Sequence, residues 1–137
     1  MIVPWLLVLA ASVNGGTGAA EVLHLQGRCA YNAVVRSQRG DTVLVTCDTV
    51  DIDQSSNVGS VVYRQRSWDA TMLRVEGKWD GDRMTVRHLA LRNGTSGDAK
   101  GMCSIFRRAG RVSVVSCLAK MGGRSFAANF EMSRIIN

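Results

Sequence analysis

Apolar and polar residues alternate along much of the chain after residue 20. The clearest stretch is 126–132, in which Phe126 and Phe130 fall on one face and Asn129 and Glu131 on the other. A period of two is typical of a β-strand with one buried face, and no segment after residue 20 shows a convincing helical period. The pattern predicts strands at 22–37, 42–52, 60–67, 70–79, 83–92, 100–108, 111–120 and 124–134, with loops at 53–59 and 93–99.

Three parts of the chain share one arrangement of residues. In each part, a Gly precedes a Cys or Trp by two positions, and a later Gly precedes a second Cys or a His by seven. The residues paired in this way are Cys29 and Cys47, Trp79 and His88, and Cys103 and Cys117. We interpret the repeat as three β-hairpins of one design. The alternative is chance similarity, because short β-forming segments use few residue types.

Regular hairpins at this spacing predict an all-β fold. The fold class expected is a small antiparallel barrel, either up-and-down or OB-like, or a compact sandwich. In both architectures the edges of the sheet are closed or covered.

The repeat also predicts two disulfides, each formed within one hairpin. Folding near Gln38 brings the first pair of cysteines together, and folding at Gly110 brings the second pair together. In each hairpin the two sulfurs fall on one face, where cross-strand neighbours are close enough to bond. Four cysteines permit three pairings, and the sequence leaves the other two open. In the middle hairpin, Trp79 and His88 occupy the matching places and are expected to form an aromatic pair. The predicted bridges are Cys29–Cys47 and Cys103–Cys117.

The first 20 residues have the features of an export signal. An apolar run from Met1 to Val13 is too short to cross a bilayer as a helix, and small residues follow it as far as Ala20. We therefore expect a signal peptide at 1–20, a single disulfide-bonded β domain at 21–137, and a secreted or periplasmic location without a transmembrane segment in the mature form. The alternative is a buried N-terminal strand, since no Lys or Arg precedes the apolar run.

Positive charge is concentrated at the C-terminal end. Residues 99–137 hold seven basic side chains and one acidic one, whereas residues 21–59 hold three basic and five acidic ones. Guanidinium groups present paired donors to phosphate or carboxylate oxygens, so an anionic partner is expected. The alternative is a solvated charged edge that discourages aggregation. The candidate anion-binding residues are Arg107, Arg108, Arg111, Lys120 and Arg124.

Catalytic, metal and cofactor sites are not predicted. The two histidines have no visible nucleophile beside them, and oxidised cysteines cannot act as nucleophiles. Asp80 and Asp82 flank Gly81 as a hairpin turn requires. The polar stretch 51–57 resembles a calcium loop only faintly, because it lacks the Gly and the terminal Glu of an EF-hand.

The sequence therefore favours a non-enzymatic extracytoplasmic binding or structural module with a basic hairpin face for anionic ligands. The expected partners are an anionic envelope component, an acidic glycan or an acidic protein. The alternative function is that of a secreted inhibitor or partner-binding domain that docks on an acidic protein surface. The low aromatic content and the predicted export argue against nucleic acid as a partner.

Overall fold

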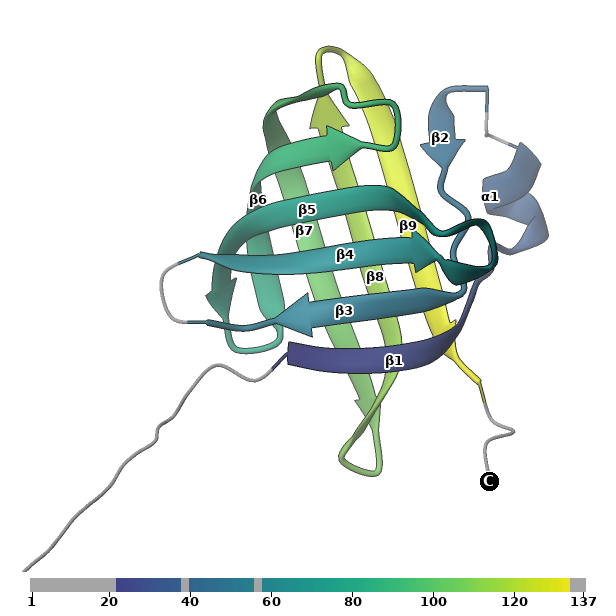
Figure 1. The fold of residues 1–137 in the computed structure, drawn as a ribbon, viewed down its shortest axis with the longest axis vertical. Helices are drawn as coiled ribbons and strands as arrows, with labels where there is room; N and C mark the ends of the chain where they lie inside the picture. Colours follow the sequence, from purple (N-terminus) through teal and green to yellow (C-terminus); the bar gives the residue numbers. More distant parts are fainter. Residues whose placement is uncertain (1–21, 38–39, 56–57, 134–137) are drawn as a thin grey trace, which may run out of the picture.

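The computed structural model describes residues 22–37, 40–55 and 58–133, and it shows a nearly all-β protein (Figure 1). The predicted signal peptide at 1–20 lies outside these ranges. Within these described ranges, nine strands form one sheet. They are β1 (Val22–Cys29), β2 (Thr42–Leu44), β3 (Thr49–Asp53), β4 (Gly59–Gln65), β5 (Ala70–Asp80), β6 (Arg83–Leu91), β7 (Ser96–Arg108), β8 (Arg111–Met121) and β9 (Arg124–Met132).

Eight of these strands close into an antiparallel barrel. Their order is β1-β3-β4-β5-β6-β7-β8-β9, and β9 returns to pair with β1. Apart from the position of β2, neighbours in the barrel follow one another along the chain, which is the up-and-down arrangement. Strand β2 is the extra strand and pairs in parallel with β9 on the outside of this order. The all-β barrel prediction is confirmed, in its up-and-down form.

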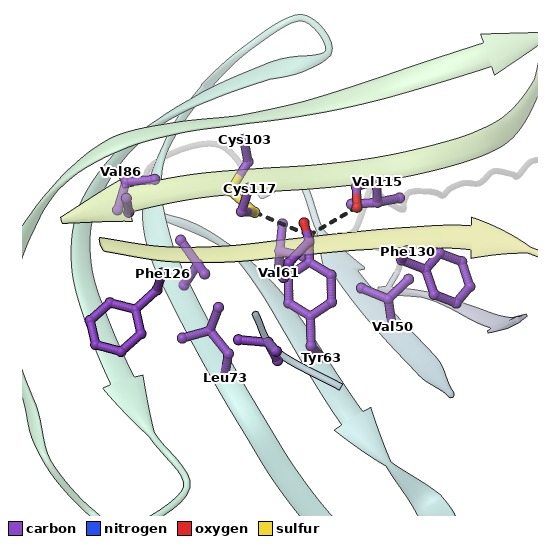
Figure 2. Packing of buried hydrophobic residues seen from close by; sticks show 14 of the residues in the cluster. Val50, Val61, Tyr63, Leu73, Val86, Cys103, Val115, Cys117, Phe126 and Phe130 are labelled. Atoms are coloured by element: carbon purple, nitrogen blue, oxygen red, sulfur yellow. Dashed lines mark hydrogen bonds between the residues drawn. A yellow bond between two sulfur atoms is a disulfide. The ribbon is translucent and has the colours of Figure 1, made fainter. Parts of the chain in front are cut away.

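The interior of the barrel is filled by side chains at alternate positions along each strand. Val50 on β3, Val61 on β4, Leu73 on β5 and Phe130 on β9 are all fully buried (Figure 2). This alternation is the one that the sequence pattern predicts, and it sends the intervening side chains to the outer face.

Tyr63 of β4 crosses the interior and joins it to the opposite wall. Its hydroxyl lies 3.0 Å from the Val115 carbonyl oxygen, to which it donates, and 3.2 Å from the Cys117 sulfur (Figure 2). Burial raises the pKa of this phenol well above its ordinary value. The hydrogen bond gives the buried hydroxyl a partner and so removes most of the cost of burying it.

Both predicted disulfides are confirmed. Cys103 and Cys117 are direct cross-strand partners on β7 and β8, and their bond lies inside the barrel. Cys29 and Cys47 join the end of β1 to the segment that precedes β3.

The prediction of the first hairpin is wrong, because the chain does not run as two long strands there. The strand expected at 22–37 ends at Cys29 and is followed by the short helix α1 (Ala33–Ser37), and the strand expected at 42–52 divides into β2 and β3. The side chain of Asn32 accepts the Val35 amide at 2.8 Å and so begins the helix. The Cys29–Cys47 bridge therefore closes an excursion of the chain that contains α1 and β2.

The middle hairpin is also corrected. Its strands pair as expected, but Trp79 lies opposite Met84 and His88 lies opposite Glu76. Trp79 and His88 therefore do not form the cross-strand pair that was predicted. The two-residue turn between Asp80 and Arg83 places Trp79 opposite Met84, and one bulge between Glu76 and Gly77 shifts the register farther along the hairpin. The Trp79 indole instead donates to the Asp53 carbonyl oxygen at 2.9 Å.

The remaining strand ends differ only slightly from the prediction. The segment predicted as strand 60–67 ends in the 3-10 helix η2 (Arg66–Trp68), and β7 begins at Ser96 and so shortens the loop expected at 93–99.

Candidate functional site

The outer face of β7 and β8 carries the same series of side-chain types on both strands. Reading along β7, the outward positions are basic, apolar, hydroxyl, apolar and basic, and each faces a residue of its own kind on β8. We call these ten residues the β7–β8 ladder. Its cross-strand pairs are Lys100 with Lys120, Met102 with Leu118, Ser104 with Ser116, Phe106 with Val114, and Arg108 with Arg111.

Large apolar side chains of the ladder lie in solvent. Met102 is 43% exposed, Phe106 54% and Leu118 59%. They point outward because the alternating neighbours, Cys103 and Cys117 among them, fill the barrel. Exposed apolar side chains grouped on one face are typical of a binding surface.

The basic side chains of the ladder have no carboxylate partner within the described part of the chain. The ion pairs found there involve Arg64, Arg74 and Arg107 among the Lys and Arg residues, and none of these three belongs to the ladder. The unpaired basic groups are Lys100, Arg108, Arg111 and Lys120. All four are exposed, so their charge is available to a partner.

Arg107 forms an ion pair within the protein. Arg107 alternates with Phe106 and Arg108 along β7 and so lies outside the ladder, and its guanidinium donates to both carboxylate oxygens of Asp82, at 2.9 and 3.1 Å. These hydrogen bonds lower the pKa of the Asp82 carboxyl and raise that of Arg107. Asp82 thus has a role beyond the hairpin turn that the sequence predicted for it.

The five residues predicted to bind anions divide between two ends of the hairpin. Arg107, Arg108 and Arg111 lie at the β7–β8 turn, as expected. Lys120 and Arg124 lie at the opposite end of β8, beside the turn into β9. Nine residue steps along β8 separate Arg111 from Lys120, which corresponds to about 30 Å. The basic residues therefore bracket a long face.

The turn end of the hairpin extends past its neighbours. The β6 pairing of β7 stops at Ser104, and the β9 pairing of β8 stops at Val114, so the strand residues between them pair only with each other (Figure 1). Asp82 in the β5–β6 turn still holds the base of this segment, because its carbonyl oxygen accepts from the Ile105 amide at 2.8 Å. Ala109 and Gly110 both have positive φ, as a two-residue hairpin turn requires. Phe106 and the Arg108–Arg111 pair lie on this projecting end.

On the opposite side of the barrel the charges neutralise one another. Asp51 on β3 accepts from His24 at 2.7 Å and from Arg64 at 3.0 Å, and its side chain is only 18% exposed. These residues line a groove of about 590 Å³ together with Thr49, whose buried hydroxyl has no hydrogen-bond partner among the residues that the structure describes.

A second groove lies beside the ladder, between α1 and the outer face of β8 and β9. It has a volume of about 450 Å³, and Val35, Leu118 and Ala127 contribute apolar lining. Tyr31 anchors its wall, since the phenol donates to the Val45 carbonyl oxygen at 2.6 Å and accepts from the Asn129 amide. Burial raises the pKa of Tyr31 to about 12.

Neither a metal cluster nor a membrane-spanning helix is found in the described part of the chain. In residues 22–37, 40–55 and 58–133, no three His, Cys, Asp or Glu side chains are grouped as metal ligands. Within the same residues, no helix is long and apolar enough to cross a bilayer.

Sequence reasoning missed the apolar half of the ladder. Met102, Phe106 and Leu118 were not proposed as site residues, although every second residue from Lys100 to Arg108 follows the series basic, apolar, hydroxyl, apolar, basic. The signal was present on β7 alone, but the matching series on β8 depends on a register with a bulge. Comparison with known protein families, curated proteins and solved structures found no match to this chain.

Proposed function

We propose that this protein is a non-enzymatic extracytoplasmic binding module that holds an anionic partner on its β7–β8 ladder. The observation that carries the proposal is the combination of four unpaired basic side chains with three exposed apolar ones on one continuous face. Export is proposed from the N-terminal sequence, and the two disulfides are compatible with an oxidising compartment.

A charged strand edge does not account for the ladder. Charged residues protect a sheet where an edge strand has unpaired backbone groups. Here β7 pairs with β6 and β8, and β8 pairs with β7 and β9, so neither strand is an edge at the end that carries Lys100 and Lys120. Only the projecting turn end, with the Arg108–Arg111 pair, lacks outer neighbours. Edge protection would also leave the exposure of Met102, Phe106 and Leu118 unexplained. Binding of a partner explains both features.

The chemistry of the ladder suits binding more than catalysis. Its polar groups are ammonium, guanidinium and hydroxyl groups, without a carboxylate or imidazole to act as a general base. Ammonium and guanidinium groups bind phosphate, sulfate and carboxylate through charge-assisted hydrogen bonds.

The test uses heparin as a soluble polyanion and compares two variants of equal net charge. Arg108→Glu with Arg111→Glu reverses the turn end of the ladder. Arg66→Glu with Lys78→Glu makes the same change in net charge at exposed positions on η2 and β5. We expect the ladder variant to elute at a clearly lower salt concentration than the control variant. Equal elution would show that net charge alone causes retention and would refute the proposal.

A further inference from the structure

We infer that the anionic partner is a lipid bilayer surface, on which the β7–β8 ladder lies with its apolar side chains in the interfacial layer. This inference rests on the proposed function and names its partner class. The proposed partner is the extracytoplasmic surface of a membrane that is rich in anionic headgroups.

The apolar members of the ladder favour a bilayer over a soluble polyanion. A sulfated or carboxylated chain in water gains by contacting Lys and Arg, but it offers nothing to Met102, Phe106 or Leu118. A bilayer interface offers anionic headgroups and, a few ångströms deeper, acyl chains. Each basic side chain near such a surface contributes to binding, and each buried methylene adds to it.

The order of side chains along the ladder fits a flat membrane surface. Eight residue steps separate Lys100 from Arg108, or about 27 Å, and basic pairs lie at both ends with apolar pairs between them. When the apolar pairs enter the interface, long Lys and Arg side chains at the ends can reach sideways to the headgroups. No acidic residue occupies an outward position within the ladder.

The shape of the hairpin allows this approach. The turn end, which carries Phe106 and the Arg108–Arg111 pair, projects past the ends of the β6 and β9 pairings, so no neighbouring strand flanks it (Figure 1). The groove beside α1 lies on the β9 side of the ladder, and Ser116 and Leu118 of the ladder form part of its lining.

The balance of charge would orient the protein on such a surface. The four basic residues of the ladder have no ion pair in the described part of the chain, whereas Asp51 on β3 and Glu76 on β5 are paired with arginines. An anionic plane therefore attracts the ladder more strongly than it attracts β3 and β4, which lie four strands away around the eight-stranded barrel. Two carboxylates adjoin the ladder: Asp98 lies two residues before Lys100 on β7, and Glu131 on β9 faces Val114. The like charges of two ladders oppose their pairing, so a second copy of this chain is a poor occupant.

The first experiment measures binding of the oxidised protein to sedimented vesicles. Vesicles of phosphatidylcholine with about 30 mol% phosphatidylglycerol are compared with vesicles of phosphatidylcholine alone. We expect binding to the anionic vesicles only. Met102→Ser with Leu118→Ser should reduce that binding at least about tenfold, because two apolar side chains no longer enter the interface. The matched control, Val22→Ser with Val58→Ser, removes apolar side chains of similar exposure away from the ladder and should bind as wild type.

The second experiment tests insertion directly. Emission from a Phe106→Trp variant, after subtraction of the wild-type signal, should shift to shorter wavelength on anionic vesicles and be quenched by brominated acyl chains. An unshifted, unquenched signal on vesicles that bind the protein would overturn the inference.

Heparin elution separates the two possible failures. If Met102→Ser with Leu118→Ser leaves both vesicle binding and heparin elution unchanged, the membrane inference is wrong and the proposed function survives, with a soluble polyanion or an acidic protein as partner. If the charge-matched variants elute together from heparin, the proposed function itself is wrong. Thermal melting confirms that each variant is folded before either comparison is made.

Discussion

Two opposite faces of the barrel use charge in different ways. On β3 and β4, the carboxylate of Asp51 is shared between His24 and Arg64, so these charges are neutralised within the protein. On β7 and β8, Lys100 lies opposite Lys120 and Arg108 lies opposite Arg111, so like charges face one another. None of the four forms an ion pair within the described residues. Like charges directly opposite one another are destabilising.

The difference separates charges that hold the fold from charges that are available to a partner. The Asp51 carboxylate is partly buried, and loss of its hydrogen-bond partners His24 and Arg64 would leave it unpaired. The ladder cations are exposed and stabilise nothing in the fold that the structure shows. Mutations on the two faces should therefore affect different measurements.

The largest expected effect is on binding by the ladder. Arg108→Glu with Arg111→Glu should weaken affinity for anionic vesicles at least about 30-fold, because each basic residue near an anionic surface contributes about 1 kcal/mol and Glu adds repulsion. The free energy of unfolding should change by no more than about 0.5 kcal/mol, as is usual for exposed residues without partners. Vesicle sedimentation and urea unfolding measure the two effects. A large loss of stability would assign these arginines to the fold.

The second largest effect is a loss of stability on removal of Asp51, on the opposite face of the barrel. Asp51→Ala should lower the free energy of unfolding by about 1–2 kcal/mol, since it removes two hydrogen bonds from a mostly buried carboxylate. Asp80→Ala, an exposed carboxylate on the same sheet, is the control and should have little effect. Vesicle binding should be unchanged in both variants. Weaker binding by Asp51→Ala would break the division between the faces.

A third prediction concerns Tyr31, which contacts β9 between the two faces. Its pKa is raised to about 12, so the phenol stabilises the fold fully below pH 10 and loses that contribution as the pH rises from 10 to 12. Tyr31→Phe should cost about 1 kcal/mol at pH 7, because the Val45 carbonyl loses its donor. Urea unfolding at several pH values should show a flatter decline above pH 10 in the variant. An unchanged decline would remove Tyr31 as its source.

The smallest effect should come from Asp82→Asn. The lowered pKa of Asp82 means that its pair with Arg107 stabilises the fold above about pH 4 and is lost as the pH falls further. Both side chains are exposed, so the variant should lose at most about 0.5–1 kcal/mol. Release of Arg107 should strengthen vesicle binding up to about fivefold. Weaker binding in this variant would contradict the assignment of Arg107 as a neutralised residue.

Much of the fold could be predicted from the alternation of side chains. Strand positions, both disulfides and the barrel follow from a period of two and from the even spacing of the cysteines. The five-residue helix α1 was missed because it is too short to show a helical period and depends on one capping side chain, Asn32. The bulge near Gly77 was missed because it depends on close packing of two strands, where a Cβ would overlap the Thr85 carbonyl oxygen.

The sequence predicted the positive charge of the candidate site but not its exposed apolar residues. Arg108 and Arg111 were identified because basic residues gather near one turn, which a linear sequence displays. The pairing of Arg107 with Asp82 joins residues 25 positions apart through strand register, which composition does not reveal. The exposure of Phe106 similarly depends on which face of β7 is turned inward.

The most direct test of the central claim is to map the bound face residue by residue. Backbone amide resonances of the oxidised protein are recorded with and without small anionic bicelles, and again with uncharged ones. Shift changes should be confined to β7, β8 and the turn at Ala109 and Gly110, and should require the anionic lipid. Changes centred on β3 and β4, or spread evenly over the barrel, would contradict the account.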